Sequence, residues 1–531
     1  MLAPPRTPFA VVNRFSPVGA IQDASMGFMT ETREILLERL KKRLAAISDV
    51  GSANSVLFWD QQTYMPKGAI AGRAEQMATL SRLAHEMLVD AETGRLLDAA
   101  GDPDPETVGG ALIRRARRDH EKATRLPSRL VEELSRATAL AEPAWAEARA
   151  NSDWSRFAPH LEKIMPLQRE VAESLGYEDH VYDALLDGYE PGATKARLEV
   201  MFEELKAGIV PMIRGISSEN GGDRAALLHG EFDEAAQERF GEEVATSFGY
   251  DWEHGRQDRV VHPFCLNLGP GDVRITTRFD PGWLSPALFG TMHETGHALY
   301  EQGVDPSYAR TPLANGTSMG VHESQSRLWE NLVGHSRPFW SCFYPRLRGA
   351  FPEALGGAEF EEFYRAINAV SPSMIRVEAD EVTYNLHIVL RFELEVALLE
   401  GSLSVADLPD AWNAKMEEYL GLTPKNDAEG ALQDVHWAAG LFGYFPTYAI
   451  GNVLSVQLFD EALKYQPGIP DAMRSGEFSA LLGWLRENVH RHGARYYPDE
   501  LVQRVTGRPL ETGPYLRYLN DKYGELYDLT R

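Results

Sequence analysis

The chain has 531 residues, 44% of them hydrophobic, and a net charge of −25. An acidic surface of this kind repels phosphate backbones and anionic lipids, so we expect neither nucleic acid nor membrane partners. No stretch approaches the roughly 18 apolar residues of a membrane span, and the only cysteines, Cys265 and Cys342, exclude a disulfide framework and fit a reducing cytoplasm.

The first segment, residues 1–28, is rich in proline and contains a single acidic residue, Asp23. It lacks the apolar stretch of a secretory signal and the amphipathic pattern of an organelle-targeting peptide. We therefore predict either a disordered N-terminal extension or a start codon upstream of the true one.

Helical periodicity dominates the rest of the chain. The predicted helices cover 30–47, 69–99, 107–150, 158–175, 193–217, 232–248 and most of the chain after 286. The one β region is 259–280, where two runs with β-branched and alternating residues flank Gly269-Pro270-Gly271 and predict a hairpin. The expected fold class is mainly α, with one small sheet directly before the stretch TMHETGHALYEQG (291–303).

That stretch lies in a predicted helix of about 286–302. Ser285 is the expected N-cap, Pro286 the first helical residue, and Gly303 the expected stop.

Inside this helix the pattern HETGH places two histidines four residues apart. Residues four apart share one helical face, so His293 and His297 can both reach one ion. Glu294 points roughly 100° away from His293, where it can hold a water bound to that ion. The alternative is two surface histidines without an ion, but the rarity of the pattern favours a metal site.

A zinc site needs a third protein ligand and an open position for water. The predicted helix GVHESQSRLWENL (320–332) offers Glu323, 26 residues after His297. The alternative for Glu323 is an i,i+4 ion pair with Arg327. Ser326 occupies the place of a second histidine in HESQS, so one ion is implied and not two.

Seven motifs occur in one order along the chain, and together they resemble the M32 metallocarboxypeptidase family over residues 30–531. They are WDQQTYMP (59–66), HPF (262–264), DVRIT (272–276), HETGH (293–297), HESQ (322–325), IRVEAD (375–380) and GALQDVHW (430–437). The resemblance implies an elongated helical groove fold related to neurolysin and angiotensin-converting enzyme. It also implies a homodimer that removes C-terminal residues one at a time, with broad specificity.

By this resemblance, residues 29–531 form a single peptidase domain. Its first part, about 29–250, would be a helical lid and groove wall, and about 251–531 the catalytic part. The family pattern makes His293, His297 and Glu323 the metal ligands and Glu294 the catalytic base.

Peptide hydrolysis also needs a donor to the developing oxyanion. His436 and Tyr448 resemble the spacing of a histidine and a catalytic tyrosine in related groove peptidases, and Tyr444 is the other candidate. The alternative for each tyrosine is ordinary aromatic packing in AAGLFGYFPTY (438–448).

A carboxypeptidase must recognise a free carboxylate, which suits the planar fork of an arginine. Arg376 is the candidate, oriented by Asp380 at i+4, and an internal Arg376–Asp380 ion pair is the alternative. Arg274 either contacts substrate or ties the sheet to the motif helix. His322 either hydrogen-bonds substrate or orients a metal ligand.

The sequence therefore predicts a zinc-type metallocarboxypeptidase acting on flexible peptides with a free C-terminus. Co²⁺ or Mn²⁺ also suits two histidines and a glutamate. The alternatives are an oligopeptidase that cuts internal bonds or releases dipeptides, and a non-catalytic helical scaffold with a vestigial metal site.

Overall fold

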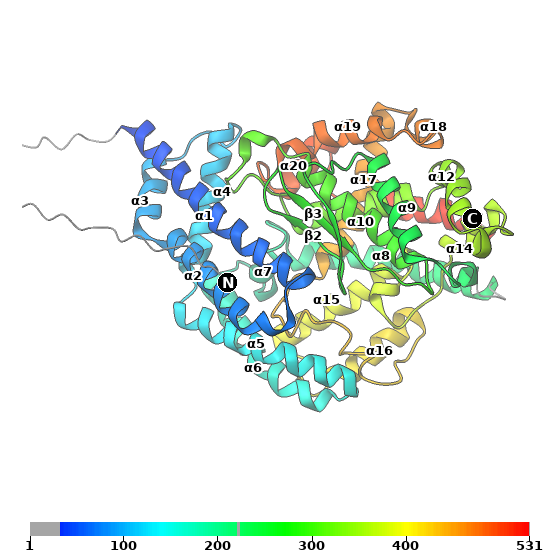
Figure 1. The fold of residues 1–531 in the computed structure, drawn as a ribbon. Helices are drawn as coiled ribbons and strands as arrows, with labels where there is room; N and C mark the ends of the chain where they lie inside the picture. The colour runs from blue at the N-terminus through cyan, green and yellow to red at the C-terminus, as the bar shows by residue number, and fades with distance from the viewer. Residues whose placement is uncertain (1–31, 220–223, 530–531) are drawn as a thin grey trace, which may run out of the picture.

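The computed structural model describes residues 32–219 and 224–529, so the predicted extension at 1–28 lies outside the described residues. These residues form 21 α-helices and one three-stranded sheet, which confirms the mainly α fold class. Helices α1 to α6 lie along the left and lower side of Figure 1, and the later helices occupy its centre and right side. No described helix is both long and apolar enough to cross a membrane.

The first nine helices differ from the predicted set in four places: the first helix continues to Thr63 instead of ending at 47, the short helix Val181–Leu186 was not predicted, and two predicted helices are interrupted. The predicted helix 69–99 is interrupted at Asp90, whose side chain accepts the backbone N–H of Glu92 and caps the next helix. The predicted helix 107–150 is interrupted at Leu126, which is extended because a proline follows it. The helices are α1 (Arg33–Thr63), α2 (Ile70–Val89), α3 (Ala91–Ala100), α4 (Val108–Arg125), α5 (Ser128–Asn151), α6 (Trp154–Leu175), α7 (Val181–Leu186), α8 (Lys195–Glu219) and α9 (Glu234–Phe248).

The sheet confirms the predicted hairpin and adds a strand that was not predicted. β2 (Cys265–Asn267) pairs antiparallel with β3 (Val273–Thr277). β1 (Gln257–Arg259) pairs parallel with β3, so β3 is the central strand. Both β2 and β3 pack against α10, which places the sheet beside the motif helix as expected.

The second half of the chain supplies the remaining helices. They are α10 (Ser285–Gln302), α11 (Met319–Arg327), continued by the π-helical turn η4 (Leu328–Gly334), α12 (Arg337–Ala350), α13 (Pro352–Leu355), α14 (Phe360–Ile367), α15 (Tyr384–Glu400), α16 (Leu408–Leu420), α17 (Pro446–Tyr465), α18 (Ile469–Arg474), α19 (Ser479–Asn488), α20 (Pro498–Thr506) and α21 (Thr512–Leu526).

The bounds of α10 match the prediction, but its ends are made differently. Leu284 holds the N-cap position and no side chain caps the helix, so the prediction of Ser285 as N-cap is wrong, while Pro286 lies in the first turn as expected. Gly303 ends the helix with φ −89°. A Cβ at this position would lie 2.6 Å from His490 Cβ, so close packing requires this glycine.

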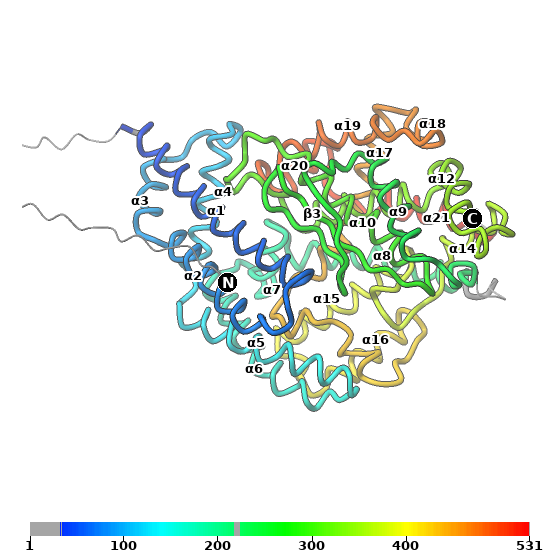
Figure 2. The backbone as a smooth tube through the Cα atoms, in the orientation of Figure 1, coloured from blue at the N-terminus to red at the C-terminus, as the bar shows by residue number. Residues whose placement is uncertain are grey.

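Two further glycines let α11 lie tightly between α10 and α17, whose backbones run through the centre of the molecule in Figure 2. A Cβ at Gly296 of α10 would lie 2.6 Å from the backbone oxygen of Gln325. A Cβ at Gly451 of α17 would lie 2.5 Å from Cγ of Glu323. Only glycine permits this approach, which brings Glu323 to the histidines of α10.

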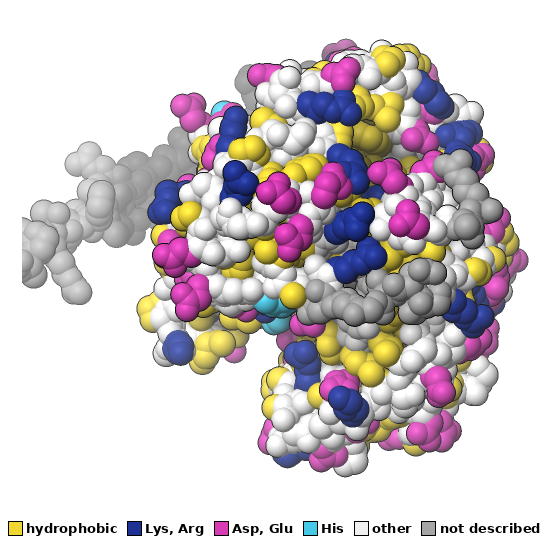
Figure 3. Space-filling view, turned by 90° about the vertical axis from the view of Figure 1, so that its right-hand side faces the viewer, with side chains coloured by type: hydrophobic (Ala, Val, Ile, Leu, Met, Phe, Trp, Pro, Cys, Tyr) yellow, Lys and Arg dark blue, Asp and Glu magenta, His cyan; other side chains and the backbone are white. Residues whose placement is uncertain are grey.

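One large hydrophobic core joins α5 to α21, and a smaller core joins α1, α3 and α4 to residues 304–314. The large core contains residues from both sides of position 250, and the division of the domain there stays a prediction. Acidic and basic side chains are interspersed over the face seen in Figure 3. Surface ion pairs such as Arg346–Glu243 contribute only about 0–1 kcal/mol each, so the cores carry the stability.

Candidate active site

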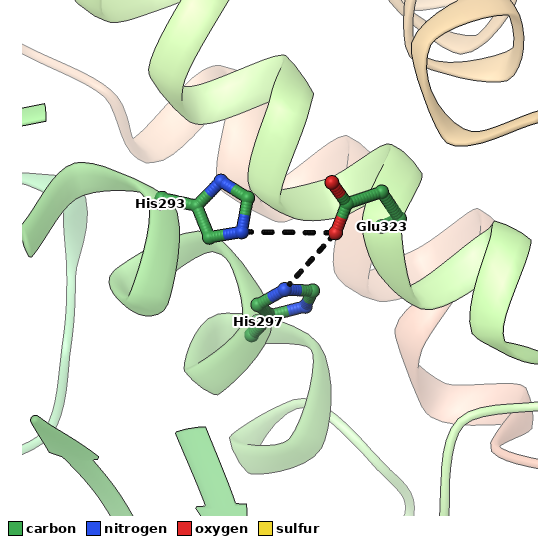
Figure 4. A group of neighbouring side chains, drawn as sticks. All are labelled: His293, His297 and Glu323. Atoms are coloured by element: carbon green, nitrogen blue, oxygen red, sulfur yellow. Dashed lines mark ion pairs between the residues drawn. The ribbon is translucent and has the colours of Figure 1, made fainter. Parts of the chain in front are cut away.

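Helices α10 and α11 bring two histidines and one glutamate together, with their side chains pointing toward one another (Figure 4). Glu323 Oε2 lies 3.6 Å from His293 Nε2 and 3.4 Å from His297 Nε2. Metal–ligand bonds of about 2.0–2.2 Å in a tetrahedron place ligand atoms roughly 3.4 Å apart. Among the described residues, these three form the one group with the spacing of a metal site.

Hydrogen bonds at the far side of each ring fix which nitrogen faces the centre. His293 Nδ1 lies 2.8 Å from Glu330 Oε2. A carboxylate only accepts, so Nδ1 carries the proton and Nε2 presents its lone pair to the centre.

His297 is also held with an unprotonated Nε2 facing the centre, through a chain of hydrogen bonds that runs over His322 to Glu301. His322 Nε2 lies 2.7 Å from Glu301 Oε1, so this nitrogen is the donor and His322 Nδ1 is the acceptor. His297 Nδ1 lies 2.5 Å from His322 Nδ1 and therefore donates to it. Nε2 of His297 is left unprotonated, as a metal ligand must be.

Glu323 divides its two oxygens between an arginine and the histidines. Oε1 accepts a 2.8 Å hydrogen bond from Arg327 Nε, while Oε2 faces the histidines. The predicted ion pair with Arg327 is therefore confirmed, and it leaves Oε2 in a position to ligate a metal. Arg327 also donates to Glu330, at 3.1 Å, which closes a ring of contacts around the candidate metal centre.

The charges of the centre favour a bound cation. Burial disfavours the charge on Glu323, but Arg327 and the two histidines outweigh burial and keep its pKa below the usual range. Burial likewise opposes charge on His293, yet Glu323 and Glu330 raise its pKa to about 9. Burial, reinforced by His322, lowers the pKa of His297 to about 3. With a pKa of about 9, His293 holds a second proton at neutral pH in the absence of an ion, and a cation bound at Nε2 would displace that proton. The donor set then fits a divalent metal held by two imidazoles and a carboxylate.

Glu294 follows His293 on α10 and is 6% exposed. Burial raises the pKa of its carboxyl to about 7. A carboxylate with a pKa near the working pH is suited to take up and release a proton.

A cluster of aromatic residues lies beside the centre, at the start of α17. His436 Nε2 is 3.3 Å from the hydroxyl of Tyr448, and the rings of Tyr444 and Tyr448 are 5.4 Å apart. Burial lowers the pKa of His436 to about 4, so the ring is neutral. The structure brings these three predicted residues together.

Arg376 is buried beside the same cluster, with its guanidinium 5.0 Å from the centre of the Tyr448 ring. It donates to Asp434 Oδ1 from Nε at 3.0 Å and from Nη2 at 2.8 Å. The predicted contact with Asp380 is therefore wrong. Asp380 accepts backbone N–H groups from Val382 and Thr383 instead, because it lies at the start of α15.

Arg274 lies on the central strand β3, and its side chain is 17% exposed. It donates to Asp272 at 2.8 and 2.7 Å, and its guanidinium lies 4.3 Å from the centre of the Trp59 ring. These contacts connect the sheet to the C-terminal end of α1.

Sequence reasoning did not single out Glu301, Glu330 or Asp434. Glu301 lies four residues after His297 on the same helical face, and Glu330 lies seven after Glu323, so helical periodicity points toward both. Asp434 comes from a distant loop. Only the fold brings it to Arg376.

Comparison with known proteins agrees with this geometry. Residues 39–523 match the carboxypeptidase Taq (M32) metallopeptidase family. Thermostable carboxypeptidase 1 of Thermus thermophilus is 45% identical over 492 residues, covering 90% of this chain and 96% of that protein. Carboxypeptidase 1 of Bacillus subtilis is 39% identical over 486 residues, covering 91% and 97%.

A solved structure shares the fold. The M32 carboxypeptidase of Deinococcus radiodurans superimposes with a TM-score of 0.90 at 46% identity, covering 93% of this chain and 100% of that one. The matches span nearly the whole chain and include the helices that carry the His-His-Glu group. The chain belongs to the carboxypeptidase Taq (M32) family and is a metallocarboxypeptidase.

Proposed function

We propose that the protein uses Zn²⁺ to hydrolyse the C-terminal peptide bond of flexible peptides and releases single amino acids with broad specificity. The observation that carries this proposal is the position of Arg376, buried beside Tyr448 in the cluster next to the metal ligands. An arginine there suits a terminal carboxylate that is one residue away from the scissile bond.

In this proposal His293, His297 and Glu323 hold the ion. Zinc, when bound, supplies Lewis acidity toward the carbonyl and activates the attacking water. Glu294 takes the proton of that water and passes it to the leaving nitrogen, a task that its pKa of about 7 supports. His322 holds His297 in the ligating tautomer through the relay from Glu301.

Tyr448 is proposed to donate to the developing oxyanion. His436 is neutral, so its Nε2–H can donate to the Tyr448 oxygen and leave the phenolic proton for the substrate. Tyr444, whose ring packs against Tyr448 and Tyr189, is proposed to line the substrate site. Arg274 is proposed to tie the sheet to α1 through Trp59 and not to bind substrate.

The carboxylate role of Arg376 has a direct test. A peptide and its C-terminally amidated form are compared in kcat/KM for the wild type, Arg376→Gln and the matched control Arg274→Gln. We expect the wild type to prefer the free acid strongly, Arg376→Gln to lose roughly 10²-fold or more in kcat/KM on it, and Arg274→Gln to keep the preference. Equal cleavage of both peptides by the wild type would instead indicate an oligopeptidase that cuts internal bonds.

Three further parts of the proposal need their own measurements. Metal analysis of the purified protein distinguishes Zn²⁺ from Co²⁺ or Mn²⁺. Light scattering tests the proposed homodimer. Cell fractionation tests the proposed cytoplasmic location.

A further inference from the structure

The buried Tyr384 contacts two arginines, Arg376 and Arg327. Tyr384 is 5% exposed, and its hydroxyl accepts a 2.9 Å hydrogen bond from Arg376 Nη1. The guanidinium of Arg327 lies 4.4 Å from the centre of the Tyr384 ring. Arg327 in turn donates to Glu323 at 2.8 Å. A single side chain therefore lies between Arg376 and Arg327, the arginine that supports Glu323.

The fold fixes this tyrosine at the first residue of α15. Asp380 accepts the backbone N–H groups of Val382 at 2.9 Å and Thr383 at 3.0 Å. The backbone N–H of Tyr384 donates to the Asp380 carbonyl at 3.0 Å. Asp380 thus sets the start of the helix, and it reaches Arg376 through Tyr384.

The two hydrogen bonds to Asp434 hold only one side of the Arg376 guanidinium. Its Nε and Nη2 donate to one oxygen of Asp434, while the other oxygen accepts from Arg391 Nε at 2.7 Å. The Nη1 end is held by Tyr384 alone among the described contacts. Without that hydrogen bond, Nη1 has no hydrogen-bond partner among the described residues.

We propose that Tyr384 is a positioning residue: it holds Arg376 at a fixed place relative to Glu323, and so keeps the terminal carboxylate of the substrate in register with the metal centre. This inference rests on the carboxylate role proposed for Arg376. The hydroxyl acts on Arg376 and the ring acts on Arg327, so the two contacts can be removed one at a time.

The test uses the Zn²⁺-loaded enzyme and a peptide with a free C-terminus. Tyr384→Phe removes the hydroxyl and keeps the ring, so we expect KM to rise roughly tenfold while kcat stays within twofold. The residual cleavage of the amidated peptide and the Zn²⁺ affinity should not change. Tyr384→Leu also removes the ring below Arg327, and we expect it to lower the Zn²⁺ affinity in addition.

Tyr344→Phe is the matched control, because the buried Tyr344 hydroxyl donates to the Ala358 carbonyl away from the site. It should change neither KM nor the preference for the free acid. An unchanged KM in Tyr384→Phe, or a loss of kcat shared equally by the free and amidated peptides, overturns the inference. Arg376→Gln is measured in parallel: if that variant keeps the preference for a free carboxylate, the proposed function itself fails.

Discussion

Helices α10 and α2 have similar lengths, 18 and 20 residues, and opposite surroundings. Twelve residues of α10 are buried, and none of α2 is. α10 packs against the sheet, α9 and α11, whereas α2 packs mainly against its neighbour α1. α10 contains the HETGH motif, whereas α2 contains none of the seven motifs.

This difference in burial means that α10 lies in a tightly packed centre, whereas the α1–α2 pair is attached to the sheet by only a few contacts. The candidate metal ligands of α10, His293 and His297, lie on a buried helix and are held by hydrogen bonds at the back of each ring. The α1–α2 pair reaches the sheet through contacts such as Trp59 with Arg274 and Tyr64 with Asp258. We therefore expect small changes near α10 to have large effects, and large changes on α2 to have small ones.

The largest effect is expected at Glu294. Glu294→Gln keeps the size of the side chain and removes the base, so kcat should fall by about 10²- to 10⁴-fold. Bound zinc should remain at the wild-type level, because Glu294 is not one of the three ligands. Both kcat and the bound zinc content are measured on the same sample of the variant. A wild-type kcat would refute the mechanism.

The next largest effect is expected at Gly451, which lies outside the seven motifs but packs against Glu323. Gly451→Ala places a methyl group against Glu323, so the ligand must shift. We expect a loss of about 1–3 kcal/mol in the free energy of unfolding and a fall in Zn²⁺ affinity of more than roughly 100-fold, because a ligand itself moves.

Gly483→Ala is the matched control for this change. Gly483 lies inside α19, and nothing lies within 4 Å of a Cβ built there. That variant should be as stable as the wild type or more stable, by about 0.5–1 kcal/mol. If both alanines behaved alike, close packing around α11 would not explain the glycine at 451.

A smaller effect is expected at Glu330, which orients His293 without touching the ion. Glu330→Gln keeps an acceptor but loses the negative charge, so the Zn²⁺ affinity should fall by about 10- to 100-fold. Competition with a chelator measures this affinity. An unchanged affinity would show that packing alone orients His293.

The smallest effect is expected on α2. Leu83 is 39% exposed, so Leu83→Gln should change the free energy of unfolding by no more than about 0.5 kcal/mol. Chemical denaturation measures this change. A loss of several kcal/mol would break the contrast between α2 and α10 and would indicate that α2 is packed against another surface.

Much of the metal centre follows from the sequence because its ligands lie on two helices with regular spacing. Periodicity predicts α10 to within a residue and the hairpin before it, and HExxH predicts two ligands. Glu323 is different, since the residues alone favour an ion pair with Arg327 over a metal-ligand role. The family pattern selects it, and the structure brings it to the histidines.

The remaining features depend on contacts between segments far apart in the chain. Arg376 was assigned to Asp380 because they are four residues apart, but the segment is a short 3₁₀ turn, Arg376–Glu378, and not an α-helix. The arginine therefore turns toward Asp434, 58 residues away. The parallel strand β1 was missed for a similar reason, because three residues carry too little pattern to be recognised.

The central claim is that the metal centre and Arg376 act together on the last peptide bond. The most direct measurement is time-resolved mass spectrometry of an unblocked peptide digested by the Zn²⁺-loaded enzyme. The account predicts a ladder of products that shortens from the C-terminus by one residue at each step. Internal fragments, or products that shorten by two residues at a time, would contradict it.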